Sequence, residues 1–90
     1  MKKEIWKFEL DMIESDTIDM PIGAEILTVQ AQNGFPCLWA LVDPLALTEK
    51  RFFEEKVATV YSLKSDIDRV YLGTYKLYNG SLVFHVFEKV

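Results

Sequence analysis

Residues 25–44 read EILTVQAQNGFPCLWALVDP, and this stretch decides the fold. Asn33-Gly34 lies between two runs of strand-forming residues, which is the strongest short-range signal for a hairpin closed by a two-residue type I′ turn. Such a turn also sets the register of the two strands. The predicted pairs are Gln32 with Phe35, Val29 with Leu38, Leu27 with Ala40 and Glu25 with Val42.

Because side chains alternate along a strand, this register separates two faces of the hairpin. One face is wholly apolar and is the predicted core side: Leu27, Val29, Ala31, Leu38, Ala40 and Val42. The other face is mixed in polarity: Ile26, Thr28, Gln30, Cys37, Trp39 and Leu41.

Asn79-Gly80, near the end of the chain, predicts a second hairpin in the same way. A type I′ turn there predicts one set of pairs on the more apolar face: Leu77 with Leu82, Tyr75 with Phe84, Gly73 with Val86 and Tyr71 with Glu88. On the other face it predicts Lys76 with Val83, Thr74 with His85 and Leu72 with Phe87.

The remaining segments complete a β-rich chain. Residues 3–12 alternate in polarity and residues 17–20 are short and β-branched, so both predict strands. Residues 48–69 carry apolar residues at helical spacing as well as strand formers, and we favour a strand broken near Glu54-Glu55. The sequence therefore predicts one all-β domain over residues 1–90, mainly antiparallel. We expect a small sandwich or rolled barrel of about six or seven strands, with at most one short helix within 48–69.

Length and charge exclude several functional classes. The chain has 90 residues, 10 Lys and Arg against 14 Asp and Glu, and a net charge of −4. Without a basic stripe, nucleic-acid binding is not expected. The longest uncharged run, 26–42, is interrupted by amides, Gly34 and Pro36, so we expect no membrane helix. No apolar segment follows the first lysines as in a signal peptide, and one cysteine forms no internal disulfide, so we expect a cytoplasmic protein.

No motif in the sequence points to catalysis. His85 is the only histidine and Cys37 the only cysteine. We interpret His85 as a structural strand residue bonded to Thr74, and Cys37 as a small apolar packing residue, because neither has the polar neighbours that a base, nucleophile or metal ligand needs. The Asp residues at 16, 19, 66 and 68 lie in or beside turns, where aspartate is expected. We therefore predict no catalytic residue, no metal and no cofactor.

Trp39 is the residue of greatest functional interest. Tryptophan is enriched at binding hot spots because it offers a large apolar area together with one hydrogen-bond donor. The predicted interface consists of Trp39 with its neighbours on the mixed face: Cys37, Gln30, Thr28 and Leu41. The alternative is that another layer covers this face and buries Trp39 in an ordinary core.

Several motifs resemble a family of small uncharacterised proteins encoded in bacteriophages, prophages and their bacterial hosts. They are WKFEL at 6–10, IDMPIGA at 18–24, ILTVQAQNG at 26–34, PCLWALVDP at 36–44, GTY at 73–75 and GSLVFHVF at 80–87. The similarity is weakest over 45–69. It implies a small β-rich protein of the host cytoplasm, with no established activity, cofactor or catalytic residue.

The leading hypothesis is a non-enzymatic interaction or accessory module that self-associates through the face with Trp39, or binds an unidentified host or phage protein. A second hypothesis is an acidic inhibitor or nucleic-acid mimic that acts on a host protein. It would need the acidic residues of 9–19 on one exposed face. A third is an enzyme using His85, which would need a further polar group close to that imidazole.

Overall fold

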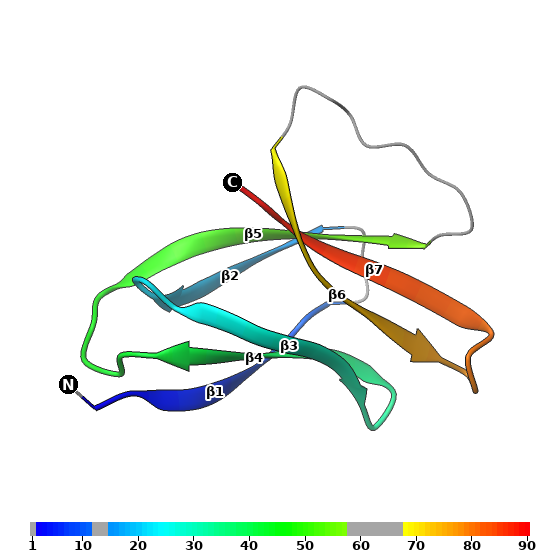
Figure 1. Ribbon diagram of the computed structural model, residues 1–90, viewed down its shortest axis with the longest axis horizontal. Coiled ribbons are helices and arrows are strands. Elements are labelled where there is room, and N and C mark those ends of the chain that lie inside the picture. The colour runs from blue at the N-terminus through cyan, green and yellow to red at the C-terminus, as the bar shows by residue number, and fades with distance from the viewer. Residues whose placement is uncertain (1, 12–14, 58–67) are drawn as a thin grey trace.

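The computed structural model describes residues 2–11, 15–57 and 68–90, and these residues form seven antiparallel strands (Figure 1). The strands are β1 (Glu4–Glu9), β2 (Ser15–Pro21), β3 (Glu25–Gln32), β4 (Phe35–Val42), β5 (Thr48–Val57), β6 (Arg69–Leu77) and β7 (Leu82–Lys89). A three-stranded sheet has the order β1-β4-β3, and a four-stranded sheet has the order β2-β5-β7-β6. This confirms the all-β, antiparallel class and the predicted number of strands.

The two sheets form a sandwich-like arrangement rather than a closed barrel. The closest approach between sheets joins β3 to β6, where Gly73 lies against Val29. The core between the sheets is built from both: Leu10, Met20, Ala24, Val29, Leu38, Ala40, Val42, Phe53, Tyr75, Leu77 and Val86. The four-stranded sheet therefore covers only the inner side of the three-stranded sheet.

The first hairpin confirms the predicted turn and half of the predicted register. Asn33 and Gly34 have φ values of 52° and 81°, as a type I′ turn requires. Val29 lies opposite Leu38 and Gln32 opposite Phe35. The register then shifts between Ile26 and Thr28, so Ile26 rather than Leu27 pairs with Ala40, and Glu25 pairs with Leu41 rather than Val42.

This β-bulge corrects the predicted core face. The extra residue turns Ile26 toward the core and leaves Leu27 45% exposed. Ala31, beside the turn, is also exposed. Leu27 therefore belongs to the solvent side of the sheet, which becomes more apolar than the sequence predicted.

The second hairpin follows the predicted register from Gly73 to Val86 and on to the turn. The pairs Gly73–Val86, Thr74–His85, Tyr75–Phe84, Lys76–Val83 and Leu77–Leu82 are all confirmed. A second shift between Tyr71 and Gly73 pairs Tyr71 with Phe87, so the predicted pairs Tyr71–Glu88 and Leu72–Phe87 are wrong. Tyr78 shares the positive φ of Asn79 and Gly80, so the loop spans four residues.

The segment after Pro44 forms a strand over its described part. β5 runs without interruption from Thr48 to Val57, so the predicted break at Glu54-Glu55 is wrong. The alternation of apolar and polar residues is interrupted at Glu54-Glu55 because both side chains are buried, although they project to opposite faces of the sheet. The predictions for 58–67 lie outside the described residues.

Gly73 gives the first testable prediction. A Cβ at position 73 would lie 3.3 Å from the Cβ of Val29, so Gly73→Ala overpacks the contact between β6 and β3. We expect a loss of about 1–3 kcal/mol in the free energy of unfolding. Val29→Gly, which removes that Cβ, should cost stability alone but recover part of the Gly73→Ala loss in the double variant. Denaturant titrations of the four proteins measure this coupling, and strict additivity would contradict the contact.

Candidate interaction face

The outer side of the three-stranded sheet is the candidate site, and the central strand β4 places Trp39 in its middle. Lys7 of β1 lies opposite Trp39 on one side, and Thr28 of β3 lies opposite it on the other. The outward side chains around it define what we call the Trp39 face: Ile5, Lys7, Glu9, Glu25, Leu27, Thr28, Gln30, Trp39 and Leu41.

The Trp39 face contains an open hollow of about 310 Å³. Five side chains line it: Ile5, Leu27, Thr28, Gln30 and Trp39. Ile5 and Leu27 remain exposed, so the described residues leave this side of the sheet open to solvent. Single exposed apolar residues are common, but several around one hollow are typical of a binding surface.

The polar side chains of this face differ in how well they are hydrogen-bonded. The ammonium of Lys7 in β1 donates to Oε1 of Gln32 in β3 at 2.9 Å, so this hydrogen bond joins the two edge strands over the central strand β4. The Gln30 amide lies 3.5 Å from Oγ1 of Thr28, a long contact that leaves both groups available to another partner. The rim is thus polar and the centre apolar, as in protein interfaces.

The predicted interface residues do not all contribute in the same way. Thr28, Gln30 and Trp39 share the hollow, and Leu41 is half-buried opposite Ile5. Cys37 is buried, and its thiol lies 3.6 Å from the carbonyl oxygen of Phe35. Burial raises the pKa of the Cys37 thiol, although Lys7 partly opposes this. Cys37 therefore packs beneath the face and is protonated at neutral pH.

His85 has the partner that the sequence predicted. Its Nδ1 lies 2.7 Å from Oγ1 of Thr74, and Thr74 also contacts the phenol of Tyr71. The Tyr71 ring packs edge-on against Phe87, 5.6 Å between centroids. These four contacting side chains lie on the outer side of the four-stranded sheet, which is the opposite side of the molecule from the Trp39 face.

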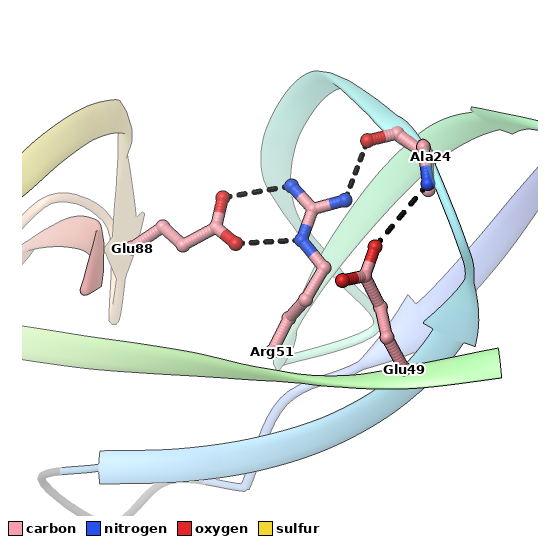
Figure 2. A network of polar contacts seen from close by, with 5 residues as sticks. Ala24, Glu49, Arg51 and Glu88 are labelled. Carbon is pink, nitrogen blue, oxygen red and sulfur yellow. Dashed lines mark hydrogen bonds and ion pairs between the residues drawn. The ribbon is translucent and has the colours of Figure 1, made fainter. Parts of the chain in front are cut away.

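Sequence reasoning missed two groups of residues. Ile5 and Leu27 join the hollow only because of strand order and the bulge. Two buried ionic networks also escaped notice, one on Arg51 and Glu88 and one on Glu54. Figure 2 shows the first, in which the guanidinium of Arg51 lies between the Glu88 carboxylate and the carbonyl of Ala24.

The described residues contain no group of three or more His, Cys, Asp or Glu side chains suited to holding a metal ion. Within the same residues, no helix has the length and apolar character needed to cross a membrane.

Together these features define a two-sheet antiparallel β domain in which the described residues leave one sheet face of mixed polarity open to solvent. The family model of a domain of unknown function (DUF7352) matches residues 1–90, so the chain belongs to that family. No curated protein and no solved structure shows significant similarity to this chain.

Proposed function

We propose that the protein is a non-enzymatic interaction or accessory module that self-associates through the Trp39 face. The observation that carries this is the open hollow around Trp39, lined mainly by apolar side chains and lying on a sheet side that the second sheet does not cover. A second copy is the simplest occupant, because a two-fold axis lets one self-complementary surface bury itself.

The composition of the hollow supports self-association, because none of the five side chains that line it is charged. A sheet face in water usually carries Lys, Glu and Thr, whereas interface centres are depleted of charge and enriched in aromatic residues. No charged residue lies between Ile26 and Val42. Nothing in that stretch therefore opposes the approach of a second apolar surface.

Trp39→Ala is the direct test. Removing a central interface tryptophan costs at least about 2 kcal/mol of association, or more than tenfold in Kd. We expect the variant to shift from dimer to monomer in sedimentation velocity, with its far-UV circular dichroism unchanged. Gln30→Lys, an exposed position on the same face, should dissociate the dimer without touching the core.

Trp6→Ala is the matched control, because Trp6 lies on the same sheet opposite Ala40 and faces away from Trp39. It should leave the Kd within about threefold. A parent protein that is monomeric at high micromolar concentration would refute self-association. Loss of folding by Trp39→Ala, with no effect of Gln30→Lys on the Kd, would assign Trp39 to the core instead.

We further propose that the module acts in the cytoplasm of a bacterial host and derives from a phage or prophage, on the strength of the sequence motifs given above. The acidic-mimic alternative has less support. Asp16 projects to the same side as Phe53, toward the core, while Glu9 lies on the other sheet. The described acids therefore do not share one exposed face. The enzyme alternative has in its favour the contact of His85 with Thr74, which in turn contacts the Tyr71 phenol.

A further inference from the structure

We propose that the occupant of the hollow is the loop 43–47 of a second copy, so that two copies exchange loops about a two-fold axis. This inference rests on the proposed self-association and specifies its geometry.

The loop presents apolar side chains to solvent in a fixed conformation. Leu45 and Leu47 are 92% and 81% exposed. The amide of Leu45 donates to Oδ1 of Asp43 at 3.0 Å, and the amide of Ala46 donates to the Asp43 carbonyl at 3.1 Å. The amide of Ile22 donates to the Leu47 carbonyl at 2.8 Å, which ties the loop to the turn after β2. The loop is thus ordered before binding, which reduces the entropic cost of association.

The loop and the hollow lie at the same end of the molecule. The loop begins directly after Val42, the last residue of β4, and Ile5 of the hollow lies opposite Leu41. Figure 1 shows this loop beside the beginnings of β1 and β3, which supply Ile5 and Leu27. Because both features share one end, a single two-fold axis can seat each loop in the hollow of the other copy.

The area of the sheet face argues for a contribution from the loop. Three strands about 4.8 Å apart and eight residues at about 3.3 Å each give a footprint of roughly 380 Å². A stable interface buries about 800 Å² on each partner. Exchange adds the exposed surfaces of Leu45 and Leu47 to the area that each copy buries.

Charge is also complementary between loop and rim. Asp43 lies at the base of the loop, and Lys7 lies at the edge of the hollow beside Trp39. Exchange brings these opposite charges together twice.

Mixed variants test the exchange. Leu45→Asp should raise the Kd more than tenfold in sedimentation velocity, and Trp39→Ala should do the same. An equimolar mixture of the two forms a heterodimer with one intact loop-in-hollow contact, so it should associate more tightly than either variant alone. Tyr78→Asp, at an exposed site in the β6–β7 loop, is the control and should leave the Kd unchanged.

Disulfide trapping provides a second readout, in a Cys37→Ala background. Thr28→Cys and Leu45→Cys proteins, mixed under mild oxidation, should give the mixed disulfide faster than either gives its own. Faster cross-linking of Thr28→Cys with itself would show face-to-face stacking. A dimer that Trp39→Ala dissociates but Leu45→Asp does not would overturn loop exchange and leave the proposed function standing. A monomeric parent would refute both.

Discussion

Arg51→Met is expected to lower the free energy of unfolding by about 3–5 kcal/mol, the largest effect of any substitution considered for this protein. Arg51 donates to both carboxylate oxygens of Glu88 at 2.6 and 2.8 Å, and to the carbonyl of Ala24 at 2.5 Å (Figure 2). Methionine keeps the length of the side chain but leaves the Glu88 carboxylate buried without its cation. Removing one partner of a buried pair is costly for that reason.

The network connects three parts of the fold that are distant in sequence. Arg51 belongs to β5, Glu88 to β7, and Ala24 to the turn between the two sheets. The hydrogen bond that Arg51 donates to Glu88 is the main reason that the pKa of Arg51 lies above its usual value, although burial works in the opposite direction. In the same turn, the amide of Gly23 donates to the Glu49 carboxylate at 3.2 Å. Arg51 thus anchors the chain where it passes from one sheet to the other.

Lys50→Met is the matched control, one residue away on the same strand. The Lys50 and Asp19 side chains are 70% and 60% exposed, against 16% and 11% for Arg51 and Glu88. An exposed ion pair contributes at most about 1 kcal/mol. Urea titrations at pH 7 should separate the two variants by more than 2 kcal/mol. If Arg51→Met is as mild as Lys50→Met, the buried network does not anchor the turn.

The hairpins could be predicted from sequence because their information is local. Asn33-Gly34 and Asn79-Gly80 each specify a backbone conformation that fixes the pairing of the adjacent residues. The register failed only beyond the bulges, at Leu27 in β3 and near Leu72 in β6. These are the two strands that meet between the sheets, so their bulges accommodate a contact that no local pattern encodes.

The candidate site was predictable only in part, for the same reason. Trp39, Thr28 and Gln30 share a face by alternation within one hairpin. Ile5 joins them only because β1 pairs with β4, a choice of strand order that depends on the whole fold. Leu45 and Leu47 carried no comparable signal, since exposed leucines are common on protein surfaces.

Glu54 and Glu55 are buried because of partners that are distant in sequence, which a local sequence pattern cannot predict. Two adjacent glutamates normally indicate an exposed turn, yet these are only 6% and 8% exposed. Glu54 lies among three cations: Arg69 at 2.5 Å, Lys56 at 3.6 Å and Lys89 at 3.9 Å. Glu55 faces the other side, where the Tyr75 phenol donates to its Oε2 at 2.9 Å and its buried Oε1 has no hydrogen-bond partner among the described residues.

These environments shift the two carboxyl groups in opposite directions. Burial alone would raise the pKa of Glu54, but the hydrogen bond from Arg69 and the charges of Lys89, Arg69 and Lys56 outweigh it and lower that pKa. Burial raises the pKa of Glu55, the hydrogen bond from Tyr75 only partly opposes this, and the negative charges of Asp16 and Asp11 raise it further. The fold therefore lowers the pKa of Glu54 and raises the pKa of Glu55, so it favours the charge on Glu54 and opposes the charge on Glu55.

The same substitution at these neighbours should consequently have opposite effects. Glu54→Gln leaves the cation of Arg69 in a buried site without its carboxylate, and we expect a loss of about 3 kcal/mol at pH 7. Glu55→Gln removes a buried charge with an unpartnered oxygen, and we expect a gain of about 1 kcal/mol at pH 7. Each variant serves as the control for the other, since the chemical change is identical.

The pH dependence of each effect follows from the direction of its pKa shift. A lowered pKa stabilises the fold above the unfolded value of about 4.3 for glutamate, and this contribution is lost as pH falls through the folded pKa. The cost of Glu54→Gln should therefore shrink in acid.

A raised pKa stabilises the fold below about 4.3, and this contribution is lost as pH rises through the folded pKa. The benefit of Glu55→Gln should therefore appear only above that pKa and vanish near pH 4. Urea titrations of parent and variants from pH 4 to 8 measure both curves, and stability differences of the same sign at pH 7 would contradict the two environments.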